Sequence, residues 1–107
     1  MTEVKPTTAD MPAGPELSRL AKIAVYGEAG LICRRYSTDP AAALELLVAC
    51  RGTLYAPGVD YAAAFAGTIE ARHWVACVRL PDGARPGWGH GETAPLAICR
   101  AVVEASR

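Results

Sequence analysis

The sequence predicts an α+β domain in which a small antiparallel sheet is sandwiched between three helices, in the order helix, helix, strands, helix. Two segments in the first half of the chain and one at its end carry apolar residues at helical spacing, whereas the middle third alternates as strands do. A chain of 107 residues, 51% of them hydrophobic, is long enough for one core and too short for two domains.

The first helix is expected at 15–26, after a flexible tail. Residues 1–14 show no apolar periodicity, so burial could not compensate for the entropy lost on ordering them. We therefore assign 1–14 to a tail and 15–107 to a single α+β domain. Helical spacing separates an apolar side with Leu17, Leu20, Ala21, Ile23 and Ala24 from a polar side with Arg19, Lys22 and Tyr26. Gly27 can adopt the left-handed conformation that ends a helix.

The second helix is expected at 41–51. Asp39 is a favourable N-cap, and Pro40 suits the first helical position because proline lacks the N–H that this position leaves unpaired. Apart from Glu45 and Arg51, the helix is apolar all round. We therefore expect neighbouring elements to enclose it on more than one side.

The middle of the chain has the alternation typical of strands. Apolar and polar side chains alternate with a period of two in the segments 61–72 and 73–80. These segments are expected to be neighbouring antiparallel strands. Shorter strands are expected at 31–33 and 53–56.

The last part of the chain is expected to contain a turn at 81–83, a flexible glycine-rich loop at 84–91 and a capped helix. Thr93 can accept a hydrogen bond from an early helical amide, and Pro95 suits the first turn. One arc of this helix is apolar and is expected to pack on the sheet, with Leu96, Ile98, Cys99, Val102 and Val103. Its polar side carries Arg100, Glu104 and Arg107.

Charge and cysteine content disfavour several classes of function. Eleven basic residues balance eleven acidic ones, so the chain lacks the dominant field of a general nucleic-acid binder or of an acidic DNA mimic. The cysteines lie far apart among apolar neighbours, which predicts reduced, buried thiols in a cytoplasmic protein: Cys33, Cys50, Cys77 and Cys99. No apolar run has the length of a membrane-spanning helix, and no closely spaced ligands indicate a metal or cofactor.

Several short motifs resemble, in their order, the phage ABA sandwich domain family. They are Val25-Tyr26-Gly27, the Tyr-Ser-Thr-Asp of 36–39 before an alanine-rich helix, Trp74-Val75-Ala76, and the segment 92–101 with its Ala-Ile-Cys core. The chain departs from the family pattern in the alanine-rich stretch 61–66 and in its proline-containing tail. The resemblance implies an antiparallel sheet between helical layers, a phage genome and a host cytoplasm. It assigns no activity and no catalytic residue.

Four residues are candidates for binding a partner. Trp88 lies between glycines, where an indole is hard to bury, and tryptophan is enriched among binding hot spots, so we expect a docking surface at Trp88 and His90. The alternative is that Trp88 folds back over the sheet edge. Arg34 and Arg35, followed by Tyr36, form the densest basic cluster and would suit a nucleic-acid backbone. Adjacent arginines before a helix are more often a solvated face, which is the interpretation we favour.

No arrangement of residues points to catalysis. His73 and Cys77 would share one strand face, where a histidine can activate a thiol. A histidine at the rim of the sheet beside a core thiol explains the same pattern, and we predict a non-enzymatic protein. The glycines of 87–91 do not form a phosphate-binding motif, because no lysine follows them.

These observations predict a small phage- or prophage-encoded protein that binds a host or phage protein in the host cytoplasm. Antagonism of a bacterial defence complex, an anti-CRISPR-like role, is the most concrete version. Two alternatives stay open: a self-associating accessory protein that forms a homodimer through surplus apolar surface, and a weak nucleic-acid binder acting through Arg34 and Arg35. Nucleic acid is the less favoured partner, and neither a cofactor nor a membrane contact is expected.

Overall fold

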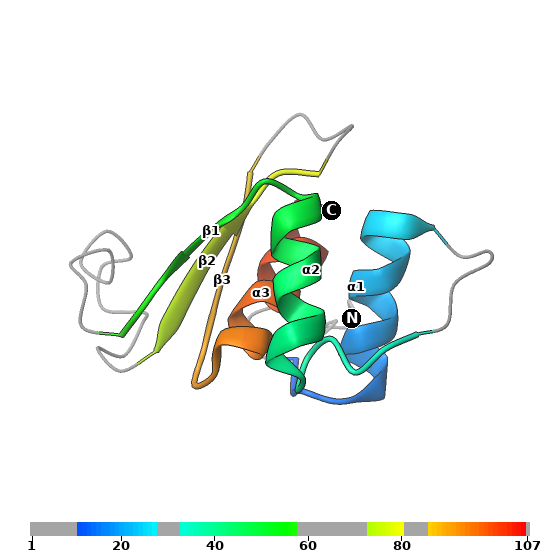
Figure 1. The fold of residues 1–107 in the computed structure, drawn as a ribbon, viewed down its shortest axis with the longest axis horizontal. Helices are drawn as coiled ribbons and strands as arrows, with labels where there is room; N and C mark the ends of the chain where they lie inside the picture. The colour runs from blue at the N-terminus through cyan, green and yellow to red at the C-terminus, as the bar shows by residue number, and fades with distance from the viewer. Residues whose placement is uncertain (1–10, 28–32, 58–72, 81–85, 107) are drawn as a thin grey trace, which may run out of the picture.

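The computed structural model describes residues 11–27, 33–57, 73–80 and 86–106. Within them the elements follow one another in the order α1 (Pro15–Tyr26), α2 (Pro40–Ala49), β1 (Thr53–Tyr55), β2 (Trp74–Val78), β3 (Gly87–Gly91) and α3 (Ala94–Ala105) (Figure 1). The predicted α+β class and the order helix, helix, strands, helix are confirmed. The strand expected at 61–72 and the turn expected at 81–83 lie outside the described residues.

The described strands form an antiparallel sheet in the order β1-β2-β3. The register places Tyr55 opposite Val75, and Val75 opposite His90. The alternation predicted for β2 is confirmed, because Ala76 and Val78 lie in the core. The strand expected at 31–33 is not confirmed at its described residue: Cys33 lies outside any strand.

Both predicted helix starts are confirmed by their hydrogen bonds. The Asp39 carboxylate accepts the N–H of Ala41 at 3.0 Å, and the Thr93 hydroxyl oxygen accepts the N–H of Leu96 at 3.3 Å. A proline follows each cap within the first turn, where its missing N–H costs nothing. The caps are local in sequence, so their chemistry is sufficient to predict where α2 and α3 begin.

Helix α3 is the centre of the fold. It packs against β2 and β3 on one side and against α1 and α2 on the other, as Figure 1 shows. The buried arc is therefore wider than the single apolar face predicted from the sequence. The residues that this adds are small ones, Ala97, Ala101 and Ala105.

Strand β3 corrects the prediction of a flexible loop at 84–91. Residues 87–91 pair with β2, and every second residue is a glycine. An added Cβ at Gly89 would lie 2.3 Å from the backbone nitrogen of Ala101, and one at Gly87 would lie 2.3 Å from the Ala101 carbonyl oxygen. These glycines are required by the close approach of α3 to the strand, rather than by flexibility.

Helix α2 is covered on one side only, which corrects the expectation that it would be enclosed on more than one side. Its buried residues are Ala42, Ala43, Leu46 and Leu47. Leu44 and Val48 are 54% and 70% exposed. Within the described part of the chain, the helix thus presents an apolar side to solvent.

Three further residues differ from their predicted environment. Lys22, expected on the polar side of α1, is buried. Of the four cysteines expected to be buried thiols, Cys33 is exposed and Cys77 is partly buried. Apolar neighbours in sequence therefore do not by themselves place a side chain in the core.

A buried hydroxyl pair joins the start of α1 to the segment before α2. The Ser37 hydroxyl donates to the carbonyl oxygen of Gly14 at 3.0 Å and accepts the Gly14 N–H at 2.9 Å. The Ser18 hydroxyl oxygen accepts the Ser37 N–H at 3.0 Å and lies 2.8 Å from the Ser37 hydroxyl oxygen. Since the Ser37 proton is already committed to Gly14, Ser18 donates in this last bond.

Candidate functional site

The strand alternation gives the sheet an outer face, directed away from α3. We call it the outer sheet face, and define it by Tyr55, His73, Val75, Cys77, Trp88 and His90. The glycines of β3 face α3, so Trp88 and His90 between them must face outward. The structure therefore brings together the two residues predicted as a docking surface, on a strand rather than in a loop.

Trp88 forms a ring pair with Tyr55 across the sheet. The rings come from β3 and β1, on either side of β2, with centroids 6.4 Å apart and planes inclined by 12°. On the middle strand, Val75 lies opposite Tyr55 and is only 3% exposed. Trp88 itself remains 38% exposed. The indole is therefore held beside a neighbouring ring, with more than a third of its surface exposed.

His73 and His90 form a second ring pair on the same face. Their Nδ1 atoms are 3.1 Å apart and their ring centroids 5.3 Å apart. The distance between the ring centroids exceeds the distance between the Nδ1 atoms by about the width of one ring. The two rings are therefore arranged end to end, with their Nδ1 atoms facing each other. One Nδ1 must donate and the other accept.

Arg100, on helix α3, holds the backbone of this site in place from the α3 side of the sheet. Its Nη1 donates to the carbonyl oxygen of His90 at 2.9 Å, and its Nε donates to the carbonyl oxygen of Met11 at 3.0 Å. The arginine predicted on the polar side of α3 thus connects α3, β3 and the segment before α1. Because this strand is already held in place, binding of a partner to its outward side chains costs little conformational entropy.

The chemistry of the outer sheet face suits binding better than nucleophilic catalysis. Burial raises the pKa of the Cys77 thiol, which keeps it protonated and weakly nucleophilic. The Nδ1 of His73 is engaged by His90. In the part of the chain that the structure describes, no three metal-ligating side chains come together.

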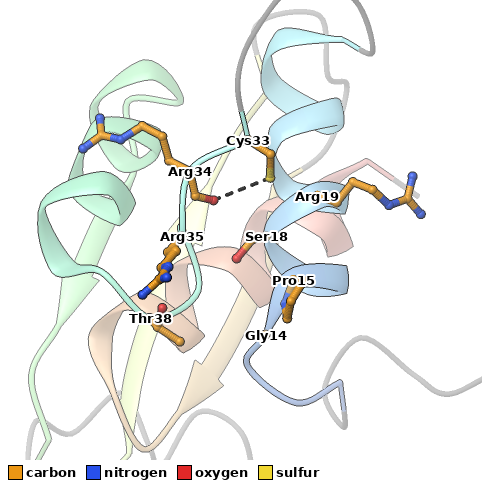
Figure 2. Close-up of a pocket in the computed structure, with 8 residues that line it drawn as sticks. All are labelled: Gly14, Pro15, Ser18, Arg19, Cys33, Arg34, Arg35 and Thr38. Carbon is orange, nitrogen blue, oxygen red and sulfur yellow. Dashed lines mark hydrogen bonds between the residues drawn. The ribbon is translucent and has the colours of Figure 1, made fainter.

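Arg34 and Arg35 lie elsewhere, in the segment between α1 and α2. Here a pocket of about 580 Å³ is lined by Gly14, Pro15, Ser18, Arg19, Cys33, Arg34, Arg35 and Thr38 (Figure 2). Figure 2 shows the Arg34 guanidinium extending away from the pocket. Arg34 forms an ion pair with Glu45 of α2, whose hydrogen bond raises the pKa of Arg34. The structure therefore does not bring the two predicted pairs of site residues together.

Two members of the site, Tyr55 and His73, were not predicted as partner-binding residues. Tyr55 meets Trp88 only because β1 and β3 flank the same strand, and His73 meets His90 only through the β2–β3 register. The glycines at alternate positions in 87–91 could have predicted this strand from the sequence. Such a pattern is typical of a strand whose glycine face packs closely against another element.

No protein-family model and no curated protein matches this chain. Among solved structures, the fold is similar to that of a phage protein from Bacillus cereus ATCC 14579, with a TM-score of 0.57 and 15% sequence identity. The similarity covers 98% of this chain and 91% of that chain. At this identity the likeness establishes a shared fold. Membership of the phage ABA sandwich domain family stays a prediction.

None of the helices in the described part of the chain is both long and apolar enough to cross a membrane.

Proposed function

We propose that this is a phage-encoded, non-enzymatic binding protein whose outer sheet face docks on a host or phage protein in the host cytoplasm. The observation that carries the proposal is the environment of Trp88. Its side chain is 38% exposed, stacks on the Tyr55 ring and is held in place by strand β3. Rigid aromatic side chains of this kind are the usual anchors of protein interfaces. The fold shared with a phage protein supports the phage origin.

The specific form of the proposal is antagonism of a host defence complex, an anti-CRISPR-like role. A small binding domain can act on a larger assembly by covering one of its surfaces. The formal net charge of zero favours a contact formed by packing over one formed by long-range attraction. Binding is then expected to change little with salt, unlike attachment to a nucleic-acid backbone.

Nucleic-acid binding through the arginine pair has less support. The Arg34 charge is balanced by Glu45, so the cluster offers less positive field than its sequence suggests. Tyr36, the aromatic neighbour of the two arginines, is buried and therefore cannot stack on a base.

The test compares Trp88→Ala with Tyr26→Ala. Tyr26, at the end of α1, is 39% exposed and so matches Trp88 at 38%, but lies away from the outer sheet face. The tagged full chain is expected to capture a stoichiometric partner from its bacterial host. W88A should weaken that complex by about 2 kcal/mol or more, and Y26A should leave it unchanged. Capture of no stoichiometric partner, or equal loss in both variants, would overturn the proposal.

The antagonist role has its own readout. Expression of the chain in a host immune to a phage is expected to restore plating of that phage, and W88A should not restore it. If the chain binds a partner through Trp88 but plating stays blocked, the docking surface stands and the defence role is wrong.

A further inference from the structure

We propose that the exposed side of α2 is a self-association surface that takes the same side of α2 from a second copy of this chain. We call it the outer α2 surface. It is an open groove of about 370 Å³ lined by Ala41, Leu44, Glu45, Val48 and Ala49. It is separate from the outer sheet face, so it does not depend on the function proposed above.

Leu44 and Val48 are the reason to expect a partner here. They are the most exposed of the large hydrophobic residues that the structure describes. They lie one turn apart and form a ridge along α2. Apolar side chains exposed singly are common, whereas contiguous exposed apolar patches are typical of association surfaces.

The shape of the surface fits a copy of itself. Positions 41, 44 and 48 have the spacing of a helix–helix seam. The small side chains of Ala41 and Ala49 leave space beside the ridge, and this space forms the groove. In a two-fold, antiparallel pair of α2 helices, Leu44 of each copy enters the groove beside Val48 of the other.

The charges at the edge of the surface are also self-complementary. Arg34 and Glu45 form an ion pair on one flank of the ridge, and both side chains are about half exposed. A two-fold axis across antiparallel helices brings the same flank of both copies together in reversed order. Arg34 of one copy then faces Glu45 of the other, and the four charges alternate in sign.

The size of the surface sets the expected strength. A helix of ten residues is about 15 Å long, and one side of it falls well short of the roughly 800 Å² per partner of a stable interface. The dimer is therefore expected to be weak and reversible, with a dissociation constant on the order of 100 μM.

The test is sedimentation velocity of the full chain over a range from about 10 μM to about 1 mM, which brackets that constant. Val48→Glu is expected to raise the dissociation constant at least about tenfold, because it places a charge in the seam. Ala56→Glu is the matched control, since Ala56 is also small, apolar and exposed but follows β1. Circular dichroism and thermal unfolding confirm that each variant is folded.

Charge reversal tests the pairing itself. Glu45→Arg should weaken the dimer, and the double variant R34E/E45R should restore it, because the alternation of signs returns. A strict monomer at the highest concentration, or equal dimerisation of V48E and wild type, would overturn the proposal. So would a monomer that binds a different protein through Val48, because the surface would then belong to that partner.

Discussion

Individual buried groups make this small domain sensitive to alkaline pH. Burial raises the pKa of Cys50 and of Cys77, and it raises the pKa of Cys99 from 9.0 to about 12. Cys99 lies in the centre of α3 and is fully buried. Its proton therefore stays bound in the folded chain at a pH where the unfolded chain releases it.

The expected consequence is a loss of stability above pH 9.0, the ordinary pKa of the thiol. From there to about pH 12 the folded state holds more protons than the unfolded state, so the free energy of unfolding falls as pH rises. Cys99 alone contributes up to about 1.4 kcal/mol per pH unit.

Urea unfolding under reducing conditions, on both sides of pH 9.0, measures this slope. Cys99→Ala should make it shallower, with a residual slope from Cys50, Cys77 and Tyr36, whose pKa values are also raised by burial. An unaltered slope in C99A would show that this thiol is not protected by the fold.

The second residue-scale prediction concerns the buried hydroxyl of Ser37. Ser37→Ala leaves the N–H and carbonyl of Gly14 and the hydroxyl of Ser18 without this partner. Unfolding in urea should show a loss of about 2 kcal/mol, typical of polar groups left unsatisfied in a core. Thr38→Ala, at the exposed neighbouring position, should cost much less. Similar costs for the two variants would mean that the network contributes little.

At the scale of elements, the closest contact in the described fold joins β3 to α3. Glycines at alternate positions of the strand meet alanines spaced by one turn in the helix, so the two backbones approach without side chains between them. Gly89 faces backbone atoms of Ala97 and Ala101. Gly91 instead faces the side chain of Leu96, with its Cβ position 2.7 Å from that Cγ.

This difference predicts which substitution can be rescued. Gly89→Ala should destabilise the fold by about 3 kcal/mol or more, because backbone cannot move aside. Gly91→Ala should cost less, and adding Leu96→Ala should recover part of that cost, since the obstacle is one side chain. Urea unfolding of five variants measures the coupling: G89A, G91A, L96A, G89A/L96A and G91A/L96A. Rescue of G89A by L96A would contradict the described contact.

At the scale of the whole molecule, α3 separates two exposed surfaces. The outer sheet face lies on the far side of the sheet from α3, and the outer α2 surface lies on a helix that packs against α3 (Figure 1). A partner on one surface therefore does not cover the other. Under the two proposals, the protein is expected to bind its target while paired with a second copy.

Independence of the two surfaces is the expected outcome. W88A should not change the dissociation constant of the dimer, and V48E should not change the affinity for the captured protein. In the double variant, the free energy of dimerisation and the free energy of partner binding should each be weakened as much as in the corresponding single variant. Sedimentation and binding measured on the same three variants provide the check. A change in dimerisation caused by W88A would place the two surfaces in contact.

Sequence patterns predicted the parts of this fold that depend on neighbouring residues. Asp39 and Thr93 begin their helices as caps, and the alternation of β2 separates core from outer face, because these are properties of a few consecutive residues. Gly87 and Gly89 could not be assigned in that way, since the requirement for glycine comes from α3 across the interface. The His73–His90 pair likewise depends on a strand register that no local motif specifies.

The contact between β3 and α3 also bears on the order in which the chain folds. Only Glu92 and Thr93 separate the two elements, so the tightest packing in the described fold closes a very short loop. Contacts between neighbours in sequence form sooner than those between distant segments. We expect this strand and helix to associate early and to provide the surface on which β2 and the two N-terminal helices then assemble. The side of β3 that carries Trp88 would thus take its final form before the rest of the domain is complete.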